Sequence, residues 1–305
     1  MNSTREMLSG VYPPMATPFR EDEILYEGIV ENVEKLNRTG LRGYFVCGTN
    51  GEFRSLTSEE RLRVIETVAR HAAGDKVVMA GTAAESTRET IELTRGAAER
   101  GARLVSVLMP SFFKKIIDDG VLIDYVLAVA DASPVPVLLY NNPSVTGGVL
   151  VSPEVVRRVS AHPNVAGMKD SSKGNYPGYL QAAGEGFHLL AGSAGFFLEL
   201  LKAGGVGGVL SLANVFPGPC VELYRAFVEG RAAEAEELNG RLVELNRQVS
   251  GPYTVAGGKA AMDLAGYVGG DPRRPLRPLG EEQRAGIREA MACSGFLDEA
   301  KGGSR

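Results

Sequence analysis

The chain has 305 residues, of which 44% are hydrophobic and 23% are charged, a composition typical of a folded globular protein with room for one large domain. Its formal net charge of -4 provides no basic excess for nucleic acid or an anionic membrane surface, so small-molecule ligands are favoured. Three scattered cysteines indicate neither a disulfide framework nor a zinc cluster, and the N-terminal MNSTREMLSG does not resemble a secretory signal. We expect a cytoplasmic protein without a membrane span.

Short apolar runs alternate with amphipathic segments of helical length along most of the chain. Start signals support several of the helices, since Thr57 opens a Thr-x-x-Glu pattern and Ser152 precedes a proline at a first helical turn. The predicted strands span residues 10–18, 41–48, 76–81, 102–110, 135–140, 164–169, 187–192 and 205–213. The predicted helices follow them, near residues 26–39, 57–73, 86–100, 119–131, 152–160, 174–184, 194–203 and 218–229.

Strands in strict alternation with helices, all apolar enough to be buried on both faces, predict a parallel sheet covered by helices. Closing that sheet gives an α/β fold, the (β/α)8 TIM barrel, and a doubly wound open sheet is the alternative. The strand pattern then disappears, and further helices are predicted near 231–249, 256–267 and 280–292. We therefore expect a barrel over residues 8–217 and a C-terminal helical extension over 218–297 packed on it.

Chemistry in a (β/α)8 barrel takes place at the carboxyl ends of the strands. Most residues at the predicted strand ends carry hydroxyl or amide groups, and Lys169, at the end of VAGMK, is the one cation among them. A lysine at a strand end is usually solvated, but an amine that points into a barrel mouth is partly desolvated and its lone pair can attack a carbonyl. This position favours Lys169 as a Schiff-base nucleophile.

Schiff-base chemistry also needs a proton shuttle and a site for the substrate carboxylate. Tyr140 ends the preceding strand, and neighbouring strands lie about 4.8 Å apart, so its phenol is within reach of the Lys169 nitrogen. Alone, such a tyrosine would be interpreted as a core residue. The turn CGTNGEF follows the second strand, and its N–H groups and hydroxyl suit a carboxylate, although a tight βα turn explains its glycines equally well. Its candidate residues are Gly48, Thr49, Asn50 and Gly51.

Three motifs occur in an order and spacing compatible with a barrel: GTNGE after the second strand, YNNPSVTG after the fifth and GMKDSS at the sixth. Over roughly residues 8–297 the sequence resembles the dihydrodipicolinate synthase / N-acetylneuraminate lyase family of class I, pyruvate-handling aldolases. Within that family, GTNGEF, GMKDS, LAGSAGF and GGVLSLANV are most similar to 4-hydroxy-2-oxoglutarate aldolase.

The resemblance implies a pyruvate Schiff base on Lys169, with Tyr140 as general acid and base. It implies that Thr49 and the region of Asn50 position the carboxylate and relay protons, and that no metal or organic cofactor is needed. Other strand-end residues complete the expected substrate-binding set, namely Ser171, Gly192 and Ser193. The family resemblance also places the PSFF loop at a subunit contact, so a homodimer or homotetramer is expected.

Three departures from the family pattern bear on the substrate. Val145 stands where dihydrodipicolinate synthases carry an arginine for the carboxylate of their second substrate, which disfavours lysine biosynthesis. Gly192 is followed by a serine and an alanine, not by the acidic pair of sialic acid lyases. Phe112, in PSFFKK, replaces a tyrosine that most relatives contribute to the proton relay of a neighbouring subunit.

Several alternatives stay open. The activity could be that of a dihydrodipicolinate synthase or of a 2-keto-3-deoxy sugar acid aldolase or dehydratase, and Phe112 is compatible with a barrel that only binds a keto acid. The glycines of GGVGGVLSLAN could bind phosphate, although no basic residue accompanies them and close strand packing explains them better. Lys259 is a weaker candidate for the imine, and the three histidines are more typical of surface or capping positions than of ligands.

Overall fold

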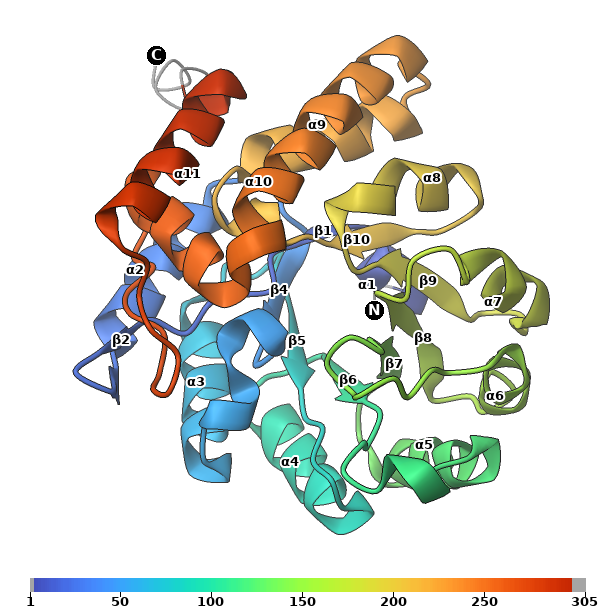
Figure 1. Cartoon of the computed structure of the whole chain (residues 1–305). Helices are drawn as coiled ribbons and strands as arrows, with labels where there is room; N and C mark the ends of the chain where they lie inside the picture. The colour runs from blue at the N-terminus through green and yellow to red at the C-terminus, as the bar shows by residue number, and fades with distance from the viewer. Residues whose placement is uncertain (1–2, 298–305) are drawn as a thin grey trace.

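Eight parallel strands are hydrogen-bonded in the order β1-β10-β9-β8-β7-β6-β5-β4 in a computed structural model that describes residues 3–297. An isolated parallel bridge between Pro14 and Phe45 brings β1 and β4 together and completes the circle (Figure 1). The predicted (β/α)8 barrel is confirmed and the open sheet is excluded. The strands are β1 (Gly10–Tyr12), β4 (Gly43–Val46), β5 (Val77–Gly81), β6 (Leu104–Leu108), β7 (Val137–Asn141), β8 (Val165–Asp170), β9 (His188–Ala191) and β10 (Gly207–Val209).

Helices follow the strands and surround the barrel, as Figure 1 shows. The predicted start signals are used: Thr57 and Glu60 form a reciprocal capping box, and Ser152 caps the backbone N–H of Val155. These helices are α2 (Tyr26–Asn37), α3 (Ser58–His71), α4 (Thr87–Glu99), α5 (Asp119–Ala132), α6 (Pro153–Val159), α7 (Tyr176–Ala182), α8 (Phe197–Lys202) and α9 (Pro217–Val228).

The C-terminal part contains the long helix α10 (Ala232–Leu264) and the shorter α11 (Glu281–Cys293), and α10 packs on both α9 and α11. The two helices predicted at 231–249 and 256–267 are joined across a kink at Thr254, whose φ of 45° is not helical. The helical character of this part was predicted correctly. The division between residues 217 and 218 stays an interpretation, because α9 contacts α10 as well as β1.

The first strand is shorter than predicted. We expected it to span residues 10–18, but β1 ends at Tyr12, because Pro13 and Pro14 lack the N–H groups that would continue a ladder. The chain then forms an antiparallel hairpin of β2 (Phe19–Arg20) and β3 (Glu23–Ile24), just after the span predicted as one strand. Within residues 3–297, no helix is both long and apolar enough to cross a membrane.

The barrel interior is filled by apolar side chains and therefore is a packed core rather than a channel. A helix ahead of the first strand, α1 (Thr4–Leu8), adds Met7 and Leu8 to this interior cluster. The strands contribute Tyr12, Phe45, Val77, Met79, Leu104, Leu138, Ala166, Leu190 and Val209. Polar groups of the site begin where this core ends, at the carboxyl ends of the strands.

Candidate active site

Lys169 lies on β8, and a bulge in that strand sets the direction of its side chain. The parallel register between β7 and β8 skips Ala166, and such bulges re-aim the residues that follow. Gly167 lets β8 lie close to β9 at this point, because a Cβ on residue 167 would lie 1.9 Å from a carbonyl oxygen of β9. After the bulge, Lys169 pairs with Tyr140 on one side and with Leu190, an interior residue, on the other. Its side chain therefore belongs to the inner face of the barrel.

The Lys169 nitrogen lies over aromatic rings. The residue is 3% exposed, and Nζ lies 3.8 Å from the ring centroid of Tyr140 and 4.9 Å from that of Phe45. The two rings meet edge to face, with their centroids 6.2 Å apart. Among residues 3–297 no carboxylate forms a salt bridge with this nitrogen. No buried carboxylate is therefore left unpaired when the nitrogen loses its charge to form a covalent bond.

The hydroxyl of Tyr140 has hydrogen-bond partners from two elements. It lies 3.1 Å from the Thr49 hydroxyl and accepts a hydrogen bond from Asn142 Nδ2 at 2.9 Å. Burial acts to raise the pKa of this phenol, but the charge of Lys169 and hydrogen bonds from Thr49, Lys169 and Asn142 outweigh burial and lower it. A phenol with a lowered pKa exchanges a proton more readily near neutral pH, as a general acid and base must.

The GTNGE turn holds Thr49 beside Tyr140. The turn is a short 3-10 helix, η1 (Thr49–Gly51), directly after β4. Gly48 is required for this path, because an added Cβ would lie 2.5 Å from the Phe45 ring. Asn50 donates from Nδ2 to the Ser211 hydroxyl at 2.8 Å, which ties the turn to the end of β10. The turn is therefore fixed from the inner wall of the barrel and from the segment that follows β10.

Backbone groups of the turn divide into two sets. The N–H of Gly51 donates to the carbonyl of Gly48 at 3.1 Å, and the carbonyl of Gly51 accepts from the Thr17 hydroxyl at 2.9 Å. Gly51 is thus engaged within the fold. The first N–H groups of a helical turn have no partner inside it, so those of Thr49 and Asn50 are the ones suited to a ligand.

The remaining predicted residues form the wall at the ends of β8 and β9. Gly192 donates its N–H to the carbonyl of Asp170 at 2.7 Å, and a Cβ on Gly192 would lie 1.9 Å from the Ser171 hydroxyl. The two residues are thus in direct contact. The Ser193 hydroxyl instead accepts from the N–H of Gly195 at 3.1 Å and caps the short turn that follows β9. Neither serine is hydrogen-bonded to Lys169 in the structure.

Lys259, the other candidate for the imine, is fully engaged elsewhere. It lies on α10, 2% exposed, with its nitrogen 2.5 Å from a Glu52 carboxylate oxygen. It also donates to the carbonyl oxygens of Thr17 and Asp271, both at 2.7 Å. Burial lowers the pKa of Lys259, and the Glu52 carboxylate opposes that effect. Two carbonyl oxygens and the Glu52 carboxylate surround the ammonium group, so this lysine anchors the GTNGE turn to the C-terminal helices.

Glu52, the ion-pair partner of Lys259, has an unusual backbone conformation. Its φ of 54° is left-handed, which costs roughly 1–3 kcal/mol for a residue other than glycine. The second carboxylate oxygen accepts from the backbone N–H of Arg273 at 2.9 Å, and the Arg273 side chain forms a bidentate pair with Glu60. The segment after α10 and the start of α3 therefore both hold the turn that carries Thr49.

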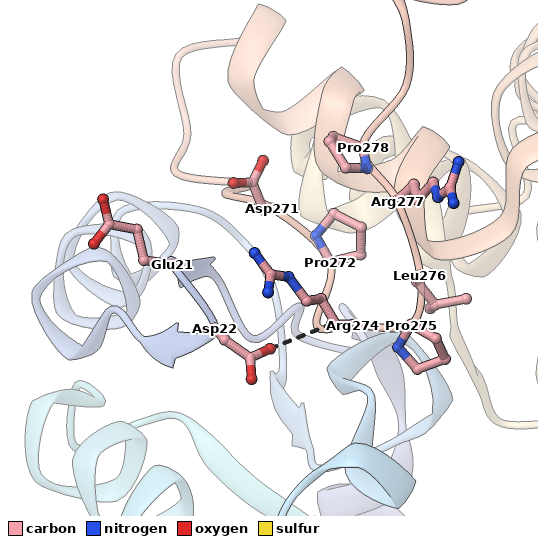
Figure 2. Close-up of a pocket in the computed structure, with 9 residues that line it drawn as sticks. All are labelled: Glu21, Asp22, Asp271, Pro272, Arg274, Pro275, Leu276, Arg277 and Pro278. Atoms are coloured by element: carbon pink, nitrogen blue, oxygen red, sulfur yellow. Dashed lines mark hydrogen bonds between the residues drawn. The ribbon is translucent and has the colours of Figure 1, made fainter.

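A hollow of about 660 Å³ lies beside this anchor, between the β2–β3 turn and the segment 271–278 (Figure 2). Acidic side chains of Glu21, Asp22 and Asp271 and the arginines Arg274 and Arg277 line it together with prolines. In Figure 2 the backbone N–H of Arg274 donates to Asp22. None of Lys169, Tyr140 and Thr49 lines this hollow, so it is separate from the site around Lys169. Its acidic and basic side chains are mixed.

Phe112 and Val145 lie on exposed loops near the mouth. Phe112 is 78% exposed and packs edge to face on Phe113, with their ring centroids 5.0 Å apart. Val145 is 45% exposed, in the loop between β7 and α6. Neither side chain brings a polar group to the phenol of Tyr140.

Three contacts of the site were not predicted from the sequence. Asn142 follows Tyr140 by two residues, so the two-residue period of a strand could have placed both side chains on one face. Ser211 and Lys259 are separated from their partners, Asn50 and Glu52, by most of the chain. No local pattern signals such pairs.

Comparisons with known proteins identify the family. The model of the dihydrodipicolinate synthetase family matches residues 7–293. A probable mitochondrial 4-hydroxy-2-oxoglutarate aldolase of Emericella nidulans is 35% identical over 300 residues, which cover 96% of each chain. A 4-hydroxy-tetrahydrodipicolinate synthase of Methanothrix thermoacetophila is 36% identical over 293 residues, which cover 93% of this chain and 96% of that one.

Solved structures agree with the sequence relatives. A dihydrodipicolinate synthase of Bacillus anthracis superposes with a TM-score of 0.88 at 27% identity, covering 93% of this chain and 98% of that one. A prophage protein of E. coli K12 from the dihydrodipicolinic acid synthase family, in complex with pyruvate, gives a TM-score of 0.88 at 28% identity, covering 94% and 99%. The chain therefore belongs to the dihydrodipicolinate synthetase family and is a lyase of the aldolase and dihydrodipicolinate synthase type.

Proposed function

We propose that this lyase is a class I aldolase that forms a Schiff base between Lys169 and a short 2-oxo acid. The observation that carries the proposal is the position of the Lys169 nitrogen, buried at the carboxyl end of β8 and 3.8 Å from the Tyr140 ring centroid. A desolvated amine without a carboxylate partner, next to a phenol that exchanges protons, is the arrangement that imine chemistry requires.

The reaction would proceed in balanced steps. The Lys169 amine adds to the keto carbon of the substrate, and loss of water gives a protonated imine. Tyr140 accepts the proton of the substrate's 4-hydroxyl group, the C3–C4 bond breaks, and its electron pair moves toward the iminium nitrogen. An aldehyde leaves and an enamine stays on Lys169. Protonation at C3 and hydrolysis release pyruvate and restore the amine.

The substrate carboxylate would lie against the GTNGE turn. The backbone N–H groups of Thr49 and Asn50 and the Thr49 hydroxyl offer donors there, and Ser171 and Gly192 would form the adjacent wall. Thr49 would also pass protons to and from Tyr140, since their oxygens lie 3.1 Å apart. Ser193 would have a lesser role, because its hydroxyl already accepts from Gly195.

We propose 4-hydroxy-2-oxoglutarate as the substrate class, which on cleavage of C3–C4 gives pyruvate and glyoxylate. The relative in Emericella nidulans carries that name at 35% identity, and the motifs GTNGEF, GMKDS, LAGSAGF and GGVLSLANV are most similar to that aldolase. The second candidate is 4-hydroxy-tetrahydrodipicolinate synthesis, because the relative in Methanothrix thermoacetophila carries that name at 36% identity. The pyruvate bound to the structural relative from E. coli supports pyruvate as the shared component.

An activity assay separates these candidates. The protein would be incubated with 4-hydroxy-2-oxoglutarate, with 2-keto-3-deoxy sugar acids, and with the substrates of 4-hydroxy-tetrahydrodipicolinate synthesis, beside a Lys169→Met control. We expect pyruvate release from 4-hydroxy-2-oxoglutarate that the control lacks. Faster formation of 4-hydroxy-tetrahydrodipicolinate would select the second candidate. Imine formation without turnover of any of them would indicate a keto-acid-binding barrel.

We also propose that the enzyme is a homodimer or homotetramer. The loop between β6 and α5 exposes three large apolar side chains, with 78% of Phe112, 67% of Phe113 and 74% of Ile116 accessible. Exposed apolar clusters of this kind are typical of association surfaces. Sedimentation of the wild type and of a Phe113→Ser, Ile116→Ser variant tests the proposal, and a monomeric wild type would contradict it.

A further inference from the structure

The phenol that serves as acid and base has a second partner on its own strand segment, and no role has yet been assigned to it. We propose that Asn142 is a positioning residue, which directs the hydroxyl proton of Tyr140 toward the reacting groups. The role of Asn142 in catalysis rests on the proposed function, whereas its hydrogen bonds are present in the protein without substrate.

The contacts of Asn142 fix both ends of its amide. Nδ2 donates to the Tyr140 oxygen at 2.9 Å, and Oδ1 accepts from the Ser144 hydroxyl at 2.6 Å. Asn142 and Tyr140 are both buried, with 9% and 4% exposed, whereas Ser144 lies on the exposed side of the loop. In this arrangement the NH₂ group is the end of the amide that faces the phenol, and Oδ1 faces the Ser144 hydroxyl.

This orientation restricts the phenolic proton. An amide nitrogen has no available lone pair, so Asn142 can only donate to the Tyr140 oxygen. The proton of Tyr140 must therefore point to a group with a lone pair, either the Thr49 hydroxyl at 3.1 Å or the Lys169 nitrogen after it loses its own proton. Both groups lie on the side of the phenol where the substrate would bind.

The other neighbours of the phenol do not compete for this role. On β4 and β6 the ring meets Phe45 and Leu108, which are apolar. Cys47 and Ser106 line a small cavity that the Tyr140 ring also reaches, and burial raises the pKa of the Cys47 thiol to about 12. Among charged groups, Lys169 on β8 has the largest effect on the pKa of the phenol, and it lowers that pKa.

Phe112 has no hydroxyl, but the proton relay through Tyr140 does not depend on one at that position. The phenolic oxygen already has hydrogen-bond partners in Thr49 and Asn142 within one chain, and the Lys169 nitrogen lies over its ring. Two hydrogen-bond partners hold the phenolic oxygen from two elements. A hydroxyl from another subunit is not needed to hold this proton in place.

The test measures ionisation of Tyr140 directly. Ultraviolet difference titration of the wild type against Tyr140→Phe isolates this phenol from the other tyrosines, and the same subtraction is made in an Asn142→Leu background. Removing an N–H donor from a buried phenolate destabilises the charged form, so we expect Tyr140 to ionise about one to two pH units higher in Asn142→Leu. Ionisation at the wild-type pH would overturn the proposal.

Two further variants keep the test decisive. Ser144→Ala, at an exposed position, removes only the hydroxyl that donates to Asn142 Oδ1, which leaves the amide less firmly held, and we expect a smaller upward shift in the same direction. Asn142→Asp keeps the shape but replaces the donor by a negative charge, and we expect an upward shift at least as large as that of Asn142→Leu. Shifts absent from both variants would overturn the proposal even where Asn142→Leu fails to fold.

Failure of this inference is distinguishable from failure of the proposed function. The titration needs no substrate, whereas borohydride trapping of pyruvate on Lys169 tests the imine. We expect the alkaline limb of the turnover rate to move upward in Asn142→Leu together with the titration. A wild type that traps no 2-oxo acid would reject the proposed function alone. Trapping on Lys169 with an unchanged titration would reject the role of Asn142 alone.

Discussion

Two lysines of this molecule are almost equally buried, Lys169 with 3% and Lys259 with 2% of the residue exposed, yet their surroundings are opposite. Lys259 meets a carboxylate and two carbonyl oxygens, all within 2.7 Å. Lys169 lies over two aromatic rings, with no salt bridge from the residues described. Burial alone therefore does not mark a nucleophile. What distinguishes Lys169 is that its nitrogen has no carboxylate partner within residues 3–297 and lies next to the Tyr140 phenol.

The first prediction concerns the lysine without a carboxylate. Lys169→Met should lower turnover at least about 1,000-fold, because the covalent route is lost. Its free energy of unfolding should be equal to or above that of the wild type, because no carboxylate loses a partner and a buried charge is removed. Steady-state kinetics and urea unfolding of the same preparation test both halves. A marked loss of stability would mean that Lys169 is a structural lysine like Lys259.

The second prediction separates covalent chemistry from proton transfer. Tyr140→Phe should lower turnover by about 10²–10⁴-fold, the usual contribution of a general acid or base. Lys169 should still form a reducible adduct with pyruvate in this variant, although more slowly. Mass spectrometry of the reduced protein checks the adduct. Normal turnover without the phenol would remove Tyr140 from the mechanism.

The third prediction concerns the anchored lysine. Lys259→Met should cost about 3–5 kcal/mol of unfolding free energy, because the Glu52 carboxylate stays buried without its partner. A Lys259→Met, Glu52→Gln double variant should recover part of that loss, since the orphaned charge is gone. Urea unfolding of the set measures the coupling. Equal stability of Lys259→Met and the wild type would contradict the assigned anchor.

The smallest predicted effect is on the pH dependence of stability at the same anchor. The hydrogen bonds from Arg273 lower the pKa of Glu60 below its ordinary 4.5. The contribution of this pair is therefore present above about pH 4.5 and is lost as the pH falls through the lower folded-state pKa. Arg273→Met should flatten that part of the profile. Unfolding midpoints across this acidic range measure it, and parallel profiles of the two proteins would contradict the assignment.

The sequence predicted the barrel because its signal is repetitive. Each buried strand and amphipathic helix repeats the same local pattern, and strand ends then bring Lys169, Tyr140 and Thr49 to one edge. The same local signals failed at the first strand, where Pro13 and Pro14 end the ladder inside an apolar run. The hairpin after that strand has only two residues per strand, too few for a periodic pattern.

The features of the site that were not predicted are mainly contacts between residues far apart in the sequence. Glu52, in the turn after β4, forms an ion pair with Lys259 on α10, 207 positions further along the chain. Asn50 likewise meets Ser211. Single positions carry no periodic signal for such pairs. The bulge at Ala166, which aims Lys169 inward, is a property of register and is equally hidden in one sequence.

The most direct test of the account is to reduce the protein with sodium borohydride in the presence and absence of pyruvate and to map the adduct by peptide mass spectrometry. The account predicts a pyruvate-dependent adduct on the peptide that contains Lys169 and none on the peptide that contains Lys259. An adduct on Lys259, or no adduct with pyruvate or any longer 2-oxo acid, would contradict it.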